Sequence, residues 1–187
     1  DWGEFMFKDS FHNLEGLTRN QALALIKSWM LFLLIRNTAV NRPILALFGQ
    51  PGSGKSTLFR LIYTLIYGPN KSLDSVTNSD NFDHSTVLDP LVVFDNVDTW
   101  TSWLPDRLAL AAGTSDITKR KLYTDTDTVT MKRQALIGIS AHNPTFGRED
   151  VIDRMLMMTF TRLPVFLHEQ PLIENILSYR ARIWGGI

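Results

Sequence analysis

Apolar residues follow two kinds of pattern along the chain, short continuous runs and longer stretches with helical spacing. Four continuous runs are typical of strands buried on both faces: residues 44–48, 91–94, 134–140 and 155–160. Helical spacing marks four further segments: residues 18–35, 58–66, 105–112 and 171–184. Because the strands are separated by helical segments, the pattern predicts an α/β domain with a central, mainly parallel sheet.

Cap and turn signals refine this pattern. Thr18 and Gln21 have the spacing of a helix-capping box, and Gly68 follows the end of a predicted helix. Residues 70–90 are polar and predict a loop. Residues 117–133 hold two threonine-rich arms around a polar centre, which predicts a β-hairpin before the third strand.

Composition and charge narrow the classes of function. The 187 residues include 19 Lys plus Arg and 19 Asp plus Glu, so the formal net charge is zero. This excludes a uniformly basic binder but not a local basic stripe. The absence of Cys excludes disulfides, Cys-ligated metals and thiol nucleophiles. The longest apolar run, residues 29–35, is well short of the about 20 residues of a membrane span.

One motif carries specific chemistry. Residues 49–56 match G-x-x-x-x-G-K-[ST] and lie between a predicted strand and a predicted helix. In such a loop the backbone N–H groups surround phosphates, Lys55 reaches the β- and γ-phosphates, and the Ser56 hydroxyl ligates Mg²⁺. The predicted ATP-binding residues are Gly49, Gln50, Pro51, Gly52, Ser53, Gly54, Lys55, Ser56 and Thr57. The alternative is a glycine-rich turn with a surface lysine.

An acidic residue follows the second predicted strand. Asp95 is expected to hold the Mg²⁺ water shell together with Ser56, the alternative being a helix or turn cap. The next position commonly carries an acid that polarises the attacking water, but here it is Asn96, whose amide orients a water without accepting its proton. Asp98 is the nearest other carboxylate, and we expect it to be a solvated or capping acid that points elsewhere.

Polar residues also follow the third strand. Asn143 and His142 are both positioned to hold an attacking water near a γ-phosphate, although Asn143 precedes a proline and could be a turn residue. Arg148 and Arg154 are candidates for a charge that a neighbouring subunit supplies to the γ-phosphate. The alternative for both arginines is an ion pair with an adjacent acid.

The predicted hairpin carries the densest basic set in the chain. Single-stranded nucleic acid would find charge at Lys119, Arg120, Lys121, Lys132 and Arg133. The tip, however, carries Asp125 and Asp127, which repel phosphate. A solvated hairpin, or one that contacts a neighbouring subunit's nucleotide, is the alternative.

The order of these features resembles a known family over residues 40–163. The features are the glycine motif, FDNVD, a helix ending at Gly113, the hairpin segment ITKRKLYTDTD, the strand into SAHNP, and EDVIDR. This order is similar to the AAA+ ATPase core of phage and mobile-element primase-helicases, close to superfamily 3 and poxvirus-type helicases. The resemblance implies a three-layer P-loop NTPase fold (AAA+-like). It divides the chain into a helical flank, 1–40, an ATPase core, 41–163, and a C-terminal helix, 164–187, that begins a truncated region.

The resemblance also implies roles for the residues. Lys55, Ser56 and Asp95 would bind MgATP, Asn143 would be the sensor, and Arg154, with Arg148 as second candidate, would be the arginine finger. A homo-oligomeric ring, expected to be a hexamer, would hold nucleotide at its interfaces and single-stranded or fork DNA in its channel. Asn96 and the acidic hairpin tip depart from the family pattern and put fast hydrolysis and tight contact of the tip with DNA in doubt.

Three functions follow from these expectations. The first is the ATP-driven motor domain of a DNA helicase from a phage or mobile element. The second is a helicase loader or nucleotide-switched assembly module with weak ATPase activity. The third is a signalling NTPase without nucleic acid, against which the basic hairpin argues. The chain begins at Asp1 without an initiator Met, so we interpret it as a fragment, expected in the cytoplasm of a bacterial or phage-infected cell and not at a membrane.

Overall fold

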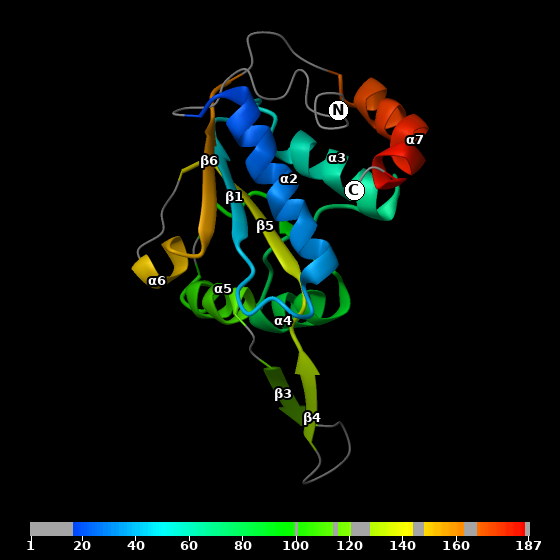
Figure 1. Cartoon of the computed structure of the whole chain (residues 1–187). Helices are drawn as coiled ribbons and strands as arrows, with labels where there is room; N and C mark the ends of the chain where they lie inside the picture. The colour runs from blue at the N-terminus through cyan, green and yellow to red at the C-terminus, as the bar shows by residue number, and fades with distance from the viewer. Residues whose placement is uncertain are drawn as a thin grey trace.

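A four-stranded parallel sheet forms the centre of the molecule (Figure 1). The computed structural model describes residues 17–99, 101–113, 116–120, 128–143, 148–162 and 168–185. The strand order is β2-β5-β1-β6, with bounds β2 Leu91–Phe94, β5 Leu136–Ala141, β1 Ile44–Gly49 and β6 Met155–Phe160. Each neighbouring pair is parallel. The predicted parallel α/β sheet is therefore confirmed.

Helices cover both faces of this sheet, which gives three layers. The first core joins α2 (Arg19–Ile35), α3 (Lys55–Tyr67) and α7 (Glu169–Gly185) to Leu45 and Leu47 of β1. The second core joins α4 (Ser79–Leu88) and α5 (Leu104–Ala112) to the alternate β1 residues Ile44, Ala46 and Phe48. Because successive side chains of a strand point to opposite faces, β1 is buried on both sides, as its continuous apolar run predicts.

Two helices were not expected from the sequence. The predicted loop at residues 70–90 is partly wrong, because α4 forms within it, capped by the Asn78 side chain, which accepts a hydrogen bond from the Asn81 N–H. The inward positions of α4 are Phe82, Asp83 and Thr86. A helix whose buried positions include a carboxylate and a hydroxyl has no clear apolar period. The other helix, α6 (Glu149–Ile152), is a single turn.

A separate antiparallel hairpin projects from one edge of the molecule (Figure 1). It consists of β3 (Asp116–Arg120) and β4 (Thr128–Lys132), with Thr118 opposite Thr130. Since β5 begins directly after β4, the hairpin lies at the amino ends of the parallel strands. The predicted hairpin is therefore confirmed, whereas its tip, residues 121–127, lies outside the described residues.

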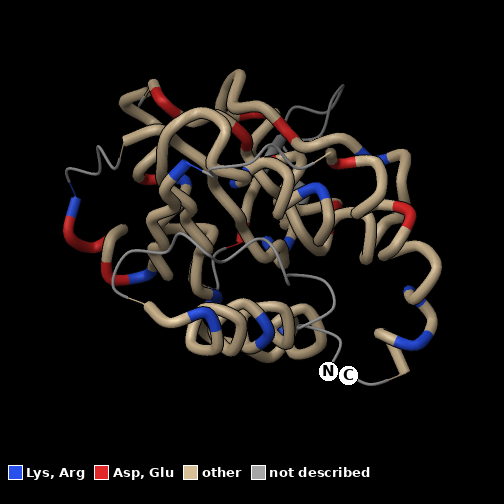
Figure 2. Tube along the Cα trace, turned by 90° about the horizontal axis from the view of Figure 1, so that it is seen from above, with Lys and Arg blue, Asp and Glu red and all other residues tan. Residues whose placement is uncertain are grey.

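Charged residues of both signs are spread over the trace instead of dividing the molecule into a positive and a negative half (Figure 2). This agrees with the zero net charge. In the described part of the chain, no helix is long and apolar enough to cross a membrane. Helices α2 and α7 pack on the same core as α3, while the division of the chain at residues 40 and 163 stays a prediction.

Candidate functional site

The glycine loop, residues 49–56, connects β1 to α3 at the carboxyl edge of the sheet. Gly52 and Gly54 have φ angles of 78° and 89°, in the left-handed region that glycine adopts without strain. Gly49 has a φ of 144°, and a Cβ there would lie 2.1 Å from the Phe160 carbonyl oxygen. Backbone conformation and close packing against β6 therefore both explain why the loop contains glycines at these positions.

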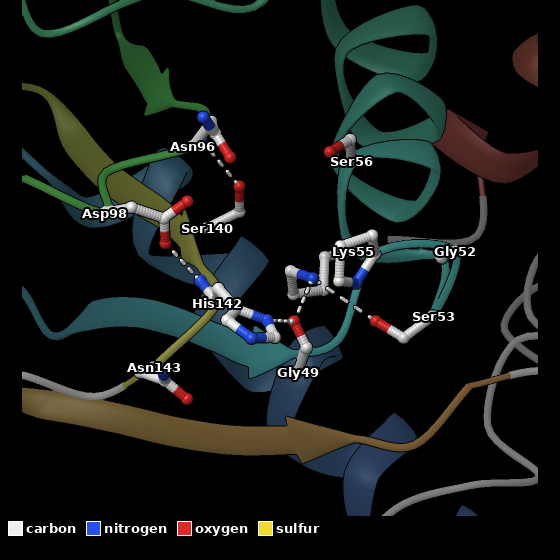
Figure 3. A pocket seen from close by; sticks show the side chains of 12 residues that line it. Gly49, Gly52, Ser53, Lys55, Ser56, Asn96, Asp98, Ser140, His142 and Asn143 are labelled. Carbon is white, nitrogen blue, oxygen red and sulfur yellow. Dashed lines mark hydrogen bonds between the residues drawn. The ribbon is translucent and has the colours of Figure 1, made fainter.

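Lys55 folds back onto its own loop (Figure 3). Its Nζ donates to the carbonyl oxygens of Gly49 at 2.5 Å and Gln50 at 3.1 Å, and to Ser53 Oγ at 3.3 Å. Burial lowers the pKa of Lys55, and the nearby charges of Asp98 and then Asp95 oppose that shift. The ammonium group is thereby held over the loop, where backbone N–H groups and the amino end of α3 add positive potential.

The two predicted metal ligands are in direct contact. Ser56 Oγ donates to Asp95 Oδ1 at 2.8 Å, and the Ser140 hydroxyl donates to the same carboxylate oxygen. These bonds join α3, β2 and β5. Within the described residues, no group of three or more His, Cys, Asp or Glu could hold a metal ion. One carboxylate and one hydroxyl suit Mg²⁺, which commonly keeps several waters and takes further oxygens from substrate phosphates.

A cavity of about 600 Å³ opens beside this contact (Figure 3). Its described lining residues are Gly49, Pro51, Gly52, Ser53, Gly54, Lys55, Ser56, Asn96, Asp98, Ser140, His142 and Asn143. We call it the glycine-loop pocket. Most of the sequence-predicted loop residues therefore surround one cavity together with Asn96 and Asn143. Thr57 lies outside this lining, and its hydroxyl donates to Glu169 Oε2 at 3.4 Å.

Asp98 lies in the pocket wall, so the expectation that it points elsewhere is wrong. The cause is Asn96, whose φ of 60° breaks the extended course of the chain after β2. The Asn96 N–H donates to Ser140 Oγ at 3.0 Å, and Asp98 Oδ1 accepts a 2.5 Å bond from the His142 N–H. The segment after β2 is thereby attached to the end of β5, and its carboxylate faces the pocket.

A second cavity of about 460 Å³ adjoins the glycine loop on its β6 side, and Asn143 and His142 line both cavities. Arg162, two residues after the end of β6, was not predicted as a site residue and lines the second cavity. Its Nε lies 3.7 Å from the point that a Cβ on Gly52 would occupy. The sequence signal that could have found it is a cation at the carboxyl end of a strand next to the glycine-loop strand.

The two candidate finger arginines differ in their surroundings. Arg148 forms ion pairs with Asp106 and, at 2.6 Å, with Asp150; these bonds raise the pKa of Arg148 and lower that of Asp150. The ion-pair alternative for Arg148 is therefore the one observed. Arg154 is exposed at the amino end of β6, where its Nη1 donates to the Ala109 carbonyl oxygen at 2.6 Å.

Arg154 and the glycine loop lie at opposite ends of the parallel strands, Arg154 at the amino ends and the loop at the carboxyl ends. Strand β6 runs parallel to β1 and has six residues, a length of about 20 Å at 3.3 Å per residue. Arg154 precedes this strand, whereas the glycine loop follows β1. The Arg154 side chain therefore cannot reach the pocket of its own chain.

One member of the predicted nucleic-acid set is misplaced. Arg133 is buried, and its Nη2 lies 2.5 Å from Asp83 Oδ1, so its assignment to a nucleic-acid surface is wrong. It follows β4 and points into the core towards α4 instead of belonging to the hairpin face. Lys132 is exposed at the end of β4, and the backbones of Lys119 and Arg120 belong to β3. Lys121 lies outside the described residues.

The fold has a parallel sheet between two layers of helices, and a glycine loop joins strand β1 to helix α3. The acidic residue after β2 contacts the start of α3 beside this loop. These features define a P-loop NTPase-like fold similar to helicase domains. The C-terminal region of NrS-1 in its apo form matches with a TM-score of 0.65 and 13% identity over 95% of this chain and 42% of that chain. The sequence model of the actinomycete integrative conjugative element replication proteins matches residues 9–185, and the chain belongs to this family.

Two structures of JCV helicase match less closely. One, with a bound acetamide compound, has a TM-score of 0.51 and 16% identity over 84% of this chain and 46% of that chain. The other has a TM-score of 0.50 and 15% identity over 88% of this chain and 56% of that one. The chain thus spans about half the length of the solved structures it matches. No curated protein matches it in sequence. The expected relationship to mobile-element replication and the helicase-like fold is confirmed at this level.

Proposed function

We propose that this protein binds ATP with Mg²⁺ in the glycine-loop pocket and hydrolyses it as the motor domain of a DNA helicase that replicates a conjugative element. The observation that supports this most directly is the hydrogen bond between Ser56 and Asp95 beside Lys55. A phosphate-binding loop, the Lys55 cation and the Ser56 hydroxyl then share one cavity, and Asp95 is hydrogen-bonded to that hydroxyl. Membership of a family of replication proteins supports DNA replication as the process in which the motor would act.

Each residue of the pocket has a separate role in this proposal. Loop N–H groups and Lys55 would hold the β- and γ-phosphates, with Lys55 exchanging the Gly49 and Gln50 carbonyls for phosphate oxygens. Ser56 and Asp95 would hold Mg²⁺, which when bound neutralises charge on the phosphates. Asn143 would orient the attacking water from the end of β5. Arg162 would add a positive charge at the β6 side of the loop.

We propose further that the working form is a homo-oligomeric ring, most simply a hexamer. Since Arg154 cannot reach its own pocket, it would complete the pocket of a neighbouring copy and stabilise transition-state charge there. The hairpin lies at the amino ends of the parallel strands, as Arg154 does. The interface through which Arg154 reaches a neighbour's nucleotide would therefore also be close to the hairpin. Lys119, Arg120, Lys121 and Lys132 would contact single-stranded or fork DNA, with the ring supplying avidity.

A second candidate function is a helicase loader or nucleotide-switched assembly module. The observation in its favour is Asn96, which places an amide instead of an acid in the pocket wall. Slow hydrolysis would suit a protein that changes partners with its nucleotide state. The two functions differ in their response to DNA, because single-stranded DNA stimulates a motor's ATPase activity and leaves that of a simple switch unchanged.

The proposal predicts that Lys55→Ala weakens the binding of MgADP and MgATP and lowers the rate of ATP hydrolysis. Without the ammonium group, the β- and γ-phosphates lose a charge-assisted partner, for which a loss of about 1.5–3 kcal/mol, or roughly 10- to 100-fold in affinity, is expected. Calorimetric titration with MgADP and MgATP measures affinity, and phosphate release with and without a single-stranded oligonucleotide measures hydrolysis.

A matched control for this experiment is Lys71→Ala. Lys71 is paired with Asp89 at 2.6 Å, away from the pocket, and its loss should leave nucleotide binding unchanged. If Lys55→Ala keeps both the affinity and the turnover of the parent protein, the assignment of the pocket to nucleotide is wrong.

A further inference from the structure

The glycine-loop pocket contains a carboxylate at an unexpected position. At the place where an acid would polarise the attacking water, the chain has Asn96, and a neutral amide does not accept a proton at ordinary pH. Of the described residues that line the pocket, Asp98 is the one with a carboxylate. Any proton transfer to a carboxylate within this lining therefore depends on Asp98.

Asp98 is held in place by the strand next to it. Its Oδ1 accepts the 2.5 Å bond from the His142 N–H, and the His142 ring lies 3.3 Å, through Nδ1, from the Gly49 carbonyl oxygen (Figure 3). This chain of contacts links Asp98 to the first residue of the glycine loop. An acceptor fixed by one oxygen keeps its second oxygen for a water, because an ionised carboxylate has about four lone-pair sites.

The carboxylate of Asp95 is engaged differently. One of its oxygens accepts hydrogen bonds from both the Ser56 and Ser140 hydroxyls, as suits a group that shares a metal ion with Ser56. Asp98 instead accepts its hydrogen bond from a backbone N–H, that of His142. The negative charge of Asp98 also opposes the burial-lowered pKa of Lys55 more strongly than that of Asp95 does. Asp95 is thus bonded to two serine hydroxyls, whereas Asp98 lines the pocket itself.

We propose that Asp98 is the carboxylate that orients and deprotonates the water attacking the γ-phosphate. The proposal rests on the proposed ATPase function and names the base for it. The water oxygen forms a bond to the γ-phosphorus, and the bond from that phosphorus to the β,γ-bridging oxygen breaks, its electron pair leaving with ADP. The water proton passes to Asp98 and from there to the released phosphate. Asn96 and Asn143 would position this water without taking its proton.

The test is Asp98→Asn, measured in single-turnover hydrolysis of MgATP with the assembled protein and single-stranded DNA. The asparagine keeps an oxygen for the His142 N–H and loses only the proton acceptor. We expect the hydrolysis rate to fall by about 100-fold or more, the usual contribution of a general base, while MgATP affinity changes by less than about twofold. Asp89→Asn, in a residue paired with Lys71, is the matched control and should leave both values unchanged.

A second variant shows whether the carboxylate or the local fold matters. Asn96→Asp combined with Asp98→Asn returns one carboxylate to the pocket at a neighbouring position. Asp tolerates the left-handed conformation of residue 96 better than Glu does, since Asn and Asp are enriched there. We expect this double variant to recover at least about tenfold of the lost rate, as a relocated general base would. A purely structural role for Asp98 would give no recovery.

The outcomes separate this inference from the proposed function. If the parent hydrolyses MgATP and Asp98→Asn hydrolyses it equally fast, Asp98 is not the base, although the ATPase proposal stands. The inference also fails if the variant loses MgATP affinity as much as it loses rate. A parent that binds neither MgATP nor MgADP overturns the proposed function itself.

Discussion

Asp83 is a buried carboxylate between two arginines. Its Oδ1 lies 2.5 Å from Arg133 Nη2 and its Oδ2 lies 3.1 Å from Arg107 Nη1. The side chains of Asp83 and Arg133 are both almost fully buried, at 3% and 2% exposed. The contact joins α4, α5 and the residue that follows the hairpin. A charge this deep is stable only with its partner, so the cluster holds the base of the hairpin against the core.

At this scale we predict that Asp83→Ala destabilises the protein by about 3–5 kcal/mol, because it leaves the Arg133 charge buried without this carboxylate. Urea unfolding followed by circular dichroism measures the change. Asp89→Ala breaks the partly exposed pair with Lys71 and should cost at most about 1 kcal/mol. Equal losses in the two variants would contradict the account of Asp83.

At the scale of elements, two tyrosines of α3 protect the outer edge of strand β2. Tyr63 Oη accepts from the Val93 N–H at 2.7 Å and donates to Asp74 Oδ2 at 2.9 Å. Tyr67 Oη accepts from the Leu91 N–H at 3.0 Å and donates to the Leu91 carbonyl oxygen at 2.7 Å. These hydroxyls form hydrogen bonds with backbone groups of β2 that would otherwise be available to a further strand. An edge strand covered in this way is not free to pair with another chain.

We predict that Tyr63→Phe lowers the free energy of unfolding by about 1–3 kcal/mol, because the buried Val93 N–H loses its acceptor. Thermal and urea unfolding measure the change. Tyr179→Phe is the matched control, since Tyr179 is 37% exposed and its ring contact with Arg182 survives the substitution. A Tyr63 variant as stable as the Tyr179 variant would show that the hydroxyl does not support the edge.

The same hydroxyls make stability depend on alkaline pH. Burial raises the pKa of Tyr67 to about 12 and that of Tyr63 further still. In the unfolded chain both would ionise near pH 10, so their contribution is fully present below pH 10. It is lost as the pH rises from about 10 through 12, because only the unfolded state releases its protons there. The Tyr63→Phe protein should therefore show a shallower loss of stability across this window.

At the scale of the whole molecule, each chain has the glycine-loop pocket at the carboxyl ends of its parallel strands and Arg154 at their amino ends. We predict that Lys55→Ala and Arg154→Ala each abolish hydrolysis alone, and that a mixture of the two proteins recovers part of it. A mixed oligomer contains interfaces with an intact pocket from one copy and an intact arginine from the next. Measuring ATPase activity across mixing ratios tests this, and a mixture as inactive as its components would argue against a shared site.

Local sequence patterns were sufficient for much of the fold. The glycine loop is encoded in consecutive residues, because its left-handed glycines and the helix after it depend on neighbours a few positions away. The capping box of Thr18 and Gln21 is likewise local and is present at the start of α2. Strands β1, β2 and β5 were visible as apolar runs, because strands buried on both faces exclude polar residues. Strand β6 was also visible as an apolar run, but the prediction that both of its faces are buried is wrong, because it is an edge strand and Met157 is 46% exposed. Helix α4 was missed where buried polar side chains hid its period.

Only the tertiary structure decided which distant residues meet. Strand β5 lies between β1 and β2, and this order brings Ser140 and His142 beside Asp95 and Asp98. Nothing local to Arg133 separates it from its exposed neighbour Lys132, because its partner Asp83 is 50 residues away in the chain. The sequence by itself thus determined the chemistry of the loop and the layers around it. The sheet order determined which carboxylate faces the pocket, and the packing of α4 against the residue after β4 determined which basic side chain is buried. Both depend on contacts between segments far apart in the sequence.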